Sequence, residues 1–377
     1  MNILYIGFDV EGVGGIATYS RHQVRALRDL GHDVHVISVD KQDKIFTTGY
    51  ADRHIPFASR FGVVSALARA VLAPPRPIDI VVVNHVYLAM FGRLARLLRG
   101  SPYIVNTYNI DILVTLPALR EFAFAGADLV IADCRYTIDH LPKFHARVPP
   151  TGLLYDPVDV EFFRPIPKPE ARADIARRFG FAESDLDRRF VIVTVAHMAG
   201  PPNNNKGHRQ TIEALRQLTD PRFLYLIVGA GPDRPAIEAH VRNHGVDEQV
   251  KFLGLVDQAA LPALYAGADV AVLVAKGGPG LGEAVPLGLI EASACATAFI
   301  CGNEDGSVEA IDPQQPNGFA IDPGSAAELA ARLRELADHP TLCGEMGRNG
   351  KAMVDRVFRY EKFVEQQGRL LKQVKAA

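Results

Sequence analysis

Short apolar runs rich in β-branched residues alternate with helical patterns along most of the chain, and this alternation most constrains the fold. Before residue 145 the runs are NILYIGF, DVHVISV, DIVVVN, PYIVNT and DLVIAD. After a Pro-rich stretch over residues 145–169, they are RFVIVTVAH, FLYLIVGAG, VKFLG, DVAVLVA and TAFI. Continuous apolar strands that are each followed by a helix indicate parallel sheets covered on both faces. The sequence therefore predicts an α/β protein with two doubly wound, Rossmann-like domains.

The Pro-rich stretch divides the 377 residues into two segments of ordinary domain size. We expect an N-terminal domain over residues 1–167, a second domain over 168–350, and a C-terminal helix over 351–377 that packs back on the N-terminal domain. That last segment has a helical apolar stripe at Tyr360, Phe363, Val364, Leu370, Leu371 and Val374. Ligands of such folds bind beyond the carboxyl ends of the strands, so two domains that face each other are expected to line one cleft.

Composition and charge argue against several classes of protein. A net charge of −2 gives no reason to expect a nucleic-acid partner. The four cysteines form no C-x-x-C pair, so neither a disulfide framework nor a zinc site is suggested. MNILYIGF has no basic lead, and no uncharged apolar window reaches about 18 residues. We therefore expect no signal peptide, no membrane span and a cytoplasmic location.

The segment GEAVPLGLIEAS carries two glutamates in nearly apolar surroundings. Pro286 suits the first turn of a helix, which would put Glu283 in the loop before the helix and Glu291 in its second turn. Carboxylates and free helix-start amides together can hold a polyhydroxylated ligand. Besides the glutamates, the residues expected to line that ligand are Ala284, Val285, Pro286 and Leu287. The alternative is that Glu283 caps the helix and Glu291 lies on a solvated face.

This segment and its neighbours resemble the retaining glycosyltransferases of family 4, which have the GT-B fold. EAVPLGLIE resembles the E-x7-E signature of that family, KGHRQTIEAL its Lys-Gly helix start, and FLYLIVGAGP its strand and glycine loop. Further blocks extend the resemblance over nearly the whole chain. The resemblance implies that Glu283 contacts the transferred sugar and that Glu291 binds the ribose hydroxyls of the nucleotide.

Lys206 lies directly before the helical segment RQTIEALRQL. A lysine at a helix start can offer a point charge to a diphosphate, beside the free amides of the helix. The resemblance implies this role for Lys206; the alternative is a solvated loop lysine. The family commonly has an arginine shortly before this lysine, whereas this chain has His197, which is not reliably cationic near neutral pH.

The loop FDVEGVGGIATYS places Gly14 and Gly15 between the first strand and the first helix. Glycines there allow close approach of the backbone to phosphate or sugar, and the family often has Gly-Gly in this loop. Asp40, which ends the second strand, raises the rival reading of a dinucleotide site. However, these glycines do not match G-x-G-x-x-G, and Asp40 is equally explained as a polar residue that closes a strand.

Four further positions are weaker candidates. His85 follows a strand end and is interpreted as a structural or rim residue. Many members of the family carry a histidine where this chain has Tyr108, so no acceptor role is transferred to that tyrosine. Cys134 is interpreted as packing, and the Asp185–Asp187 motif, which resembles a metal-binding D-x-D, as surface.

Basic and apolar residues are interleaved between residues 60 and 100. The basic residues are Arg60, Arg69, Arg76, Arg93, Arg96 and Arg99, against the single acid Asp79. This pattern is compatible with a peripheral contact at the inner face of a membrane, where a lipid-linked acceptor would lie. The alternative is a solvated pair of helices.

The prediction is a retaining glycosyltransferase that moves a sugar from a nucleotide-diphosphate donor to a hydroxyl of a glycan, lipid-linked or small-molecule acceptor. Lys206, His197 and the amides of Gly14 and Gly15 would stabilise the diphosphate, so neither a metal nor another cofactor is expected. One alternative is a sugar-nucleotide epimerase of the same fold. A second is a non-catalytic sugar-nucleotide-binding protein, suggested by the departures at His197, Tyr108 and Ala296–Ala298. A nicotinamide dehydrogenase is a distant third.

Overall fold

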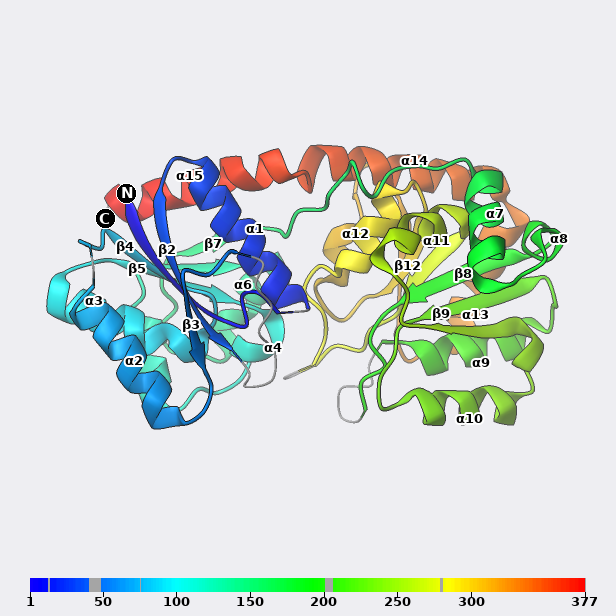
Figure 1. Ribbon diagram of the computed structural model, residues 1–377. Coiled ribbons are helices and arrows are strands. Elements are labelled where there is room, and N and C mark those ends of the chain that lie inside the picture. Colours follow the sequence, from blue (N-terminus) through cyan, green and yellow to red (C-terminus); the bar gives the residue numbers. More distant parts are fainter. Residues whose placement is uncertain (13, 41–48, 75, 201–205, 279–280, 377) are drawn as a thin grey trace. The chain divides into compact units, whose positions relative to one another are not determined.

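The computed structural model describes residues 1–376 except 13, 41–48, 75, 201–205 and 279–280 (Figure 1). The chain divides into two compact units. Unit 1 consists of Met1–Pro157 and Tyr360–Ala377, and unit 2 of Val158–Arg359. Each unit has one parallel sheet with helices on both faces, so the predicted α/β architecture with two Rossmann-like domains is confirmed.

Within the described residues, the sheet of unit 1 has seven strands in the order β3-β2-β1-β4-β5-β6-β7. The strands are β1 (Asn2–Phe8), β2 (Asp33–Asp40), β3 (Arg53–Pro56), β4 (Ile80–Val83), β5 (Tyr103–Thr107), β6 (Leu129–Ala132) and β7 (Thr151–Leu153). The α-helices are α1 (Gly15–Asp29), α2 (Arg60–Leu72), α3 (Ala89–Arg99), α4 (Asn109–Ile112), α5 (Ala118–Ala125), α6 (Arg135–His140) and α15 (Tyr360–Ala376).

Alternate residues of β1 build the two layers of the core of unit 1. Leu4 and Ile6 belong to a buried cluster with residues of α2, α3 and α5. Ile3 and Tyr5 belong to a second cluster, which includes residues of α1 and α15. This is the period-2 alternation of a strand whose two faces are both covered.

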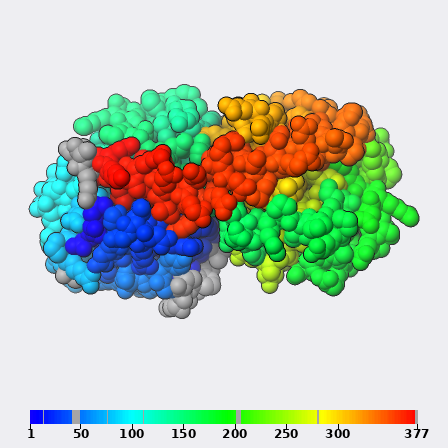
Figure 2. All heavy atoms as spheres, turned by 90° about the horizontal axis from the view of Figure 1, so that it is seen from above, coloured from blue at the N-terminus to red at the C-terminus, as the bar shows by residue number. Residues whose placement is uncertain are grey.

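Helix α15 covers part of unit 1 with the apolar stripe seen in its sequence. Phe363, Leu370 and Leu371 are buried in the cluster that also holds residues of α1. The helix lies beside α1 (Figure 1), and in the space-filling view the red C-terminal residues lie against the blue N-terminal ones (Figure 2). Gly152 of β7 is so close to Leu370 that an added Cβ would lie 2.3 Å from Leu370 Cδ2.

The sheet of unit 2 has six strands in the described residues, in the order β10-β9-β8-β11-β12-β13. The strands are β8 (Phe190–Val195), β9 (Phe223–Val228), β10 (Val250–Gly254), β11 (Val270–Leu273), β12 (Ala298–Gly302) and β13 (Gly318–Ile321). The α-helices are α7 (Lys168–Phe179), α8 (Glu183–Asp187), α9 (His208–Leu218), α10 (Arg234–His244), α11 (Leu261–Gly267), α12 (Leu287–Ala294), α13 (Ala326–Asp338) and α14 (Pro340–Val357). Helices α9 and α10 lie on one side of this sheet, and α11 and α12 on the other (Figure 1).

Three strands lie outside the apolar runs that predicted the others. β3, β7 and β13 have four, three and four residues, and β7 falls in the Pro-rich stretch interpreted as irregular. Each of the three occupies an edge of its sheet. Edge strands pair on one side only and are often short, so their local sequences carry little signal.

Candidate active site

The strand order of unit 2 brings two loops with predicted site residues together. β8 pairs with β9 on one side and β11 on the other, so the order reverses at β8 and β11. The loop after β8 carries His197 and Lys206, and the loop after β11 carries Glu283. The point where strand order reverses is the usual ligand crevice of such sheets. Residues 201–205 and 279–280 of these loops lie outside the described residues.

Gly207 determines where Lys206 lies. Gly207 is the N-cap of α9 and has φ +79°, in the left-handed region. A Cβ on this residue would lie 2.7 Å from the carbonyl oxygen of Val274, at the end of β11. Only glycine combines this φ with such close approach to backbone. The start of α9, with Lys206 before it, can therefore pack directly on the end of β11.

Lys206 and Glu283 form an ion pair between Nζ and Oε1. The side chains are 23% and 19% exposed, so the pair is sheltered but can still be reached by a ligand. Seventy-seven positions separate the two residues in the chain. The structure thus brings together the two charged residues on which the sequence prediction depends most.

Asp305, which sequence reasoning missed, holds the backbone of Glu283. The amide of Glu283 donates to Asp305 Oδ2 at 2.7 Å, and the amide of Ser307 donates to Oδ1 at 3.0 Å. Burial raises the pKa of Asp305 to about 6, although these hydrogen bonds favour the charged form. The available signal was local: Asp305 caps a short 3₁₀ helix, Gly306–Ala310, just after β12.

Glu291 is oriented by a buried tyrosine. The hydroxyl of Tyr265 donates to Glu291 Oε2 at 2.9 Å. Burial, together with the nearby Glu291 carboxylate, raises the pKa of Tyr265 well above its usual value. Glu291 is half-buried rather than on a fully solvated face. Its position in α12 is the second turn, as predicted.

Glu283 does not cap α12. The N-cap position is Pro286, which makes no capping side-chain hydrogen bond. Pro286 therefore lies one residue before the helix rather than in its first turn. The amides of Ala284, Val285 and Leu287 have no acceptor among the described residues. They remain available to a ligand at the positive end of this helix.

His197 and Lys206 line the same small cavity, of about 10 Å³. His197 is exposed and follows β8, where the backbones of Gly229 and Gly231 pack against residues 196–198. Arg209, another lining residue that sequence reasoning missed, donates to Asp233 Oδ2 at 2.8 Å. A cation three residues after Lys206 in the first turn of a helix was a readable signal.

In unit 1, Gly14 and Gly15 begin α1 after β1. Gly14 has φ +123° and is the N-cap, and Gly15 is the first helical residue. Both are exposed, and a Cβ on either would contact no atom within 4 Å. Gly14 has no side chain with which to cap this helix start, which therefore lies open to solvent.

Asp40 is engaged within unit 1. Its Oδ2 lies 2.7 Å from His54 Nδ1, and its Oδ1 accepts from the hydroxyl of Ser38. Both carboxylate oxygens therefore have partners, which favours the interpretation of Asp40 as a strand-closing residue over a ribose-binding acid.

His85 and Asp111 form a buried pair at the carboxyl ends of β4 and β5. His85 Nδ1 accepts from the amide of Tyr87, and Nε2 lies 3.3 Å from Asp111 Oδ2. Burial lowers the pKa of His85 to about 4 and raises that of Asp111 to about 8. Nearby, Tyr108 is buried, and its hydroxyl has no hydrogen-bond partner among the described residues. Burial therefore favours the uncharged forms of His85 and Asp111.

The other singled-out residues lie away from these loops or within the core. Cys134 is buried, and its sulfur lies 3.1 Å from Thr137 Oγ1. Asp185 and Asp187 are exposed on α8.

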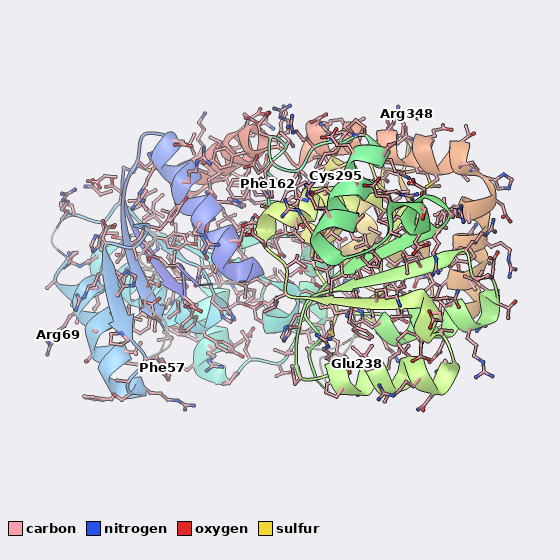
Figure 3. The ribbon with its side chains drawn as sticks, turned by 45° about the vertical axis from the view of Figure 1, so that its right-hand side comes forward. Phe57, Arg69, Phe162, Glu238, Cys295 and Arg348 are labelled. Atoms are coloured by element: carbon pink, nitrogen blue, oxygen red, sulfur yellow. The ribbon has the colours of Figure 1, made fainter. Side chains whose placement is uncertain are left out.

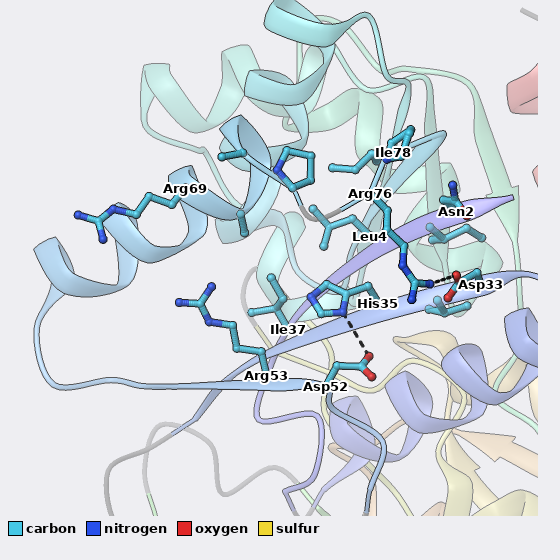
Figure 4. A pocket seen from close by; sticks show the side chains of 16 residues that line it. Asn2, Leu4, Asp33, His35, Ile37, Asp52, Arg53, Arg69, Arg76 and Ile78 are labelled. Atoms are coloured by element: carbon cyan, nitrogen blue, oxygen red, sulfur yellow. Dashed lines mark hydrogen bonds and ion pairs between the residues drawn. The ribbon is translucent and has the colours of Figure 1, made fainter.

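A larger cavity of about 650 Å³ lies in unit 1 near the amino ends of β1 and β2, where Asn2 and Asp33 line it (Figure 4). It contains none of the predicted site residues. Across the described residues, no helix is both long and apolar enough to cross a membrane.

Two family models match the chain in succession. The Glycosyl transferase 4-like domain matches residues 14–154, and Glycosyl transferases group 1 matches residues 186–353. The first match falls in unit 1 and the second in unit 2.

Individual relatives extend this similarity. A GDP-mannose-dependent alpha-(1-6)-phosphatidylinositol monomannoside mannosyltransferase of Mycolicibacterium smegmatis is 28% identical over 70% of this chain and 68% of its own. The N-acetyl-alpha-D-glucosaminyl L-malate synthase of Bacillus anthracis is 24% identical over 94% and 92%.

Solved structures share the fold. HepE of Anabaena in complex with UDP has a TM-score of 0.81 at 19% identity, over 99% of this chain and 100% of its own. Sucrose-phosphate synthase of Thermosynechococcus elongatus has a TM-score of 0.79 at 20% identity, over 100% and 99%. With both family models matched in order over most of its length, the chain belongs to the GT-B glycosyltransferases of the family 4 type.

Proposed function

We propose that this glycosyltransferase moves a sugar from a nucleoside-diphosphate donor to an acceptor hydroxyl, with retention of anomeric configuration and without a metal ion. The single observation that carries the proposal is the Lys206–Glu283 ion pair, at the point where the strand order of unit 2 reverses. It sets a cation for the diphosphate beside a carboxylate for the sugar. Free amides of the α12 start adjoin this carboxylate.

Lys206 would neutralise charge that develops on the leaving diphosphate. Its ammonium has three donors, so it can keep Glu283 while it binds a phosphate oxygen. The start of α9 adds its own amides and dipole at the same place. A fixed cation and helix dipole can together supply the positive charge that many phosphate-transferring enzymes take from a metal.

Glu283 and Glu291 would hold the sugar and the ribose. Each has a preset position, because Asp305 fixes the backbone of Glu283 and Tyr265 orients the carboxylate of Glu291. Preorganised groups of this kind lower the cost of orienting the donor.

Retention is explained by attack on the face from which the diphosphate leaves. The bond between the anomeric carbon and the phosphate oxygen breaks, and the acceptor oxygen bonds to that carbon on the same face. The acceptor proton passes to the departing phosphate oxygen, so the products are a glycoside and a nucleoside diphosphate. His197, exposed beside Lys206, would donate to a phosphate oxygen.

For the acceptor side, we propose that the α2 face of unit 1 meets an anionic membrane carrying a lipid-linked acceptor. Phe61, Val64 and Leu72 of α2 are 84%, 53% and 49% exposed. Arg60 and Arg69 of the same helix are exposed too, and Figure 3 shows Phe57 and Arg69 at the periphery of this unit. An outward apolar and basic helix is typical of interfacial binding. The phosphatidylinositol-linked acceptor in the name of the mycobacterial relative is of this chemical class.

The test of transfer is a thermal-shift screen against GDP-mannose, UDP-glucose and UDP-N-acetylglucosamine, followed by product analysis with the stabilising donor. We expect a glycoside whose anomeric configuration, read by NMR, matches that of the donor, in the presence of a chelator. An inverted product would refute retention, and loss of turnover with the chelator would refute metal independence. A new sugar nucleotide formed without acceptor would instead indicate an epimerase, and binding without turnover a non-catalytic protein.

The test of the membrane face is co-sedimentation with vesicles of phosphatidylglycerol or of phosphatidylcholine. We expect binding to the anionic vesicles only, and weaker binding by Phe61→Ser. Leu255→Ser in unit 2 is the matched control, because Leu255 is 83% exposed but follows strand β10 and lies outside α2. Equal binding by both variants and the wild type would refute this part of the proposal.

A further inference from the structure

Helices α9 and α10 bring two histidines and a glutamate together outside the candidate active site. The residues are Glu213 of α9 and His240 and His244 of α10, all half-buried. The two helices pack side by side on one face of the sheet of unit 2 (Figure 1), and Figure 3 labels Glu238 on α10. His240 and His244 are four residues apart, so they project one turn apart from the same side of α10.

The three side chains are close enough to share one ion. One ligand atom from each lies within 4.8 Å of the other two. His240 Nε2 is 3.2 Å from Glu213 Oε1, and the two imidazole centroids are 4.1 Å apart. A tetrahedral zinc with bonds of 2.0–2.1 Å separates its ligand atoms by about 3.3 Å. Small rotations of partly exposed side chains close the remaining distance.

Hydrogen bonds already select the ring nitrogen that His244 would offer. His244 Nδ1 lies 2.9 Å from the carbonyl oxygen of His240. Because a carbonyl only accepts, Nδ1 carries the proton and Nε2 carries the free lone pair. In metal-bound histidines, the ring nitrogen that does not bind the metal commonly donates to a backbone carbonyl in this way.

We propose that Glu213, His240 and His244 form a binding site for one divalent transition-metal ion, with zinc as the expected occupant. Two imidazoles and a carboxylate leave a fourth position for water and suit zinc better than calcium or magnesium, which prefer oxygen ligands. The ion takes the place of the proton that His240 Nε2 shares with Glu213, and the imidazole proton moves to Nδ1.

One neighbouring charge opposes a cation here. Arg209 lies one turn before Glu213 on α9, so it places a positive charge near the cluster. Its guanidinium is paired with Asp233 at 2.8 Å, which offsets much of this repulsion. The carboxylate and imidazoles of the cluster can therefore still bind a cation.

A bound ion would tie α9 to α10. α9 begins at the Gly207 cap beside Lys206, and α10 follows the loop of Gly229 and Gly231. The ion would thus stabilise the helices on which the candidate phosphate site depends, but the site itself does not rest on the proposed function.

The test is calorimetric titration of the untagged full chain with zinc chloride after chelator treatment, with cobalt absorption as a second readout. We expect one equivalent of zinc, a tetrahedral cobalt spectrum, and a rise in the unfolding temperature with zinc concentration. His244→Ala and Glu213→Gln should each weaken binding by at least about tenfold, because loss of even outer contacts costs that much.

His339→Ala is the matched control, because His339 is an exposed histidine of unit 2 outside the cluster. It should bind zinc like the wild type. Glu213→Gln keeps the size of the side chain, so circular dichroism can separate lost binding from lost folding. No zinc binding by the wild type, or equal binding by the wild type and both cluster variants, would overturn the proposal.

Discussion

The two units have parallel sheets of the same doubly wound kind, but the carboxyl edges of those sheets differ in charge. In unit 2 that edge carries ionised, partly exposed groups, above all the Lys206–Glu283 pair. In unit 1 the corresponding edge carries the buried His85–Asp111 pair, in which burial favours the uncharged forms, and glycines without side chains. The same topology thus supports two chemical environments.

This difference would suit unit 2 to a charged ligand and unit 1 to a neutral one. A diphosphate needs fixed positive charge, and under the proposed function it would find this charge at the start of α9 in unit 2. An acceptor hydroxyl needs orientation rather than charge, and neutral buried groups can provide that at low desolvation cost. Fold alone would not separate these roles, because function depends on the site rather than on the sheet.

The largest expected effect is loss of turnover when the charged pair of unit 2 is broken. Lys206→Ala and Glu283→Ala should each lower kcat by about 10²–10³-fold, the usual cost of a missing electrostatic group. Because the two side chains are in contact, the double variant should lose less than the product of the single losses. Steady-state kinetics with the stabilising donor measures all three.

Lys251→Ala is the control, because Lys251 lies on the edge strand β10 of the same unit. Turnover close to that of the wild type in both single variants would remove the contrast between the units.

The next effect concerns Asp305, which accepts a hydrogen bond from the amide of Glu283. The pKa of Asp305 is raised from 3.8 to about 6, so the folded protein holds this proton where the unfolded chain has lost it. The proton on Asp305 therefore stabilises the folded protein at low pH. This stabilisation is lost as the pH rises from about 4 to 6, by up to about 3 kcal/mol in total. Asp305→Asn removes this titrating carboxyl group but keeps one oxygen that can accept from the amide of Glu283.

Urea unfolding of both proteins from pH 4 to 7 measures this effect. The variant should be less stable at pH 4, because it has lost one acceptor. The difference in the free energy of unfolding between the wild type and the variant should narrow as the pH rises. If this difference in stability stays constant with pH, the pKa of Asp305 is not raised in the folded protein.

A smaller effect should follow from filling the space at Gly207. Gly207→Ala combines a left-handed φ with a Cβ 2.7 Å from Val274 O, whereas Gly245→Ala has φ +67° and no atom within 4 Å. Both pay the cost of the left-handed conformation, about 1–2 kcal/mol. The clash should add about 1–3 kcal/mol to the first alone.

Thermal and urea unfolding of these two variants isolates the contact between α9 and the end of β11. Equal destabilisation would mean that the approach of the two segments is looser than the structure shows.

The smallest effect should come from the tyrosine behind Glu291. Tyr265→Phe removes one hydrogen bond at 2.9 Å, worth about 1 kcal/mol, or about fivefold in the KM for the donor. Tyr225→Phe is the control, since the Tyr225 hydroxyl is buried and donates to Thr194 instead. A similar rise in KM for both variants would point to a general loss of stability rather than to Glu291.

Much of the fold could be read from local sequence. The runs around β1, β4, β8 and β11 are apolar and bounded by helical patterns, so each predicts a buried parallel strand on its own. β7 and β13 could not be found this way, because each is a short edge strand that pairs with a neighbouring strand on one side only. The stripe of α15 predicted a covered face but not the residues of unit 1 that cover it.

The candidate site divides in the same way. Glu283 and Glu291 are close in sequence, so helix geometry alone predicted that one lies in the loop and the other in the second turn of α12, whereas Pro286 lies one residue before the helix. Asp305 and Arg209 each had a local signal, but the contacts that place them at the site, with Glu283 and Asp233, span 22 and 24 positions.

The amino-acid sequence by itself determined most of the strands and helices, because apolar periodicity and glycine positions act over a few residues. It also carried the order of motifs that defines the family. Only the tertiary structure decided that Lys206 meets Glu283, since that contact needs β8 and β11 to be neighbours and Gly207 to lie against Val274. Strand order is a property of the whole sheet, and no local pattern of residues encodes it.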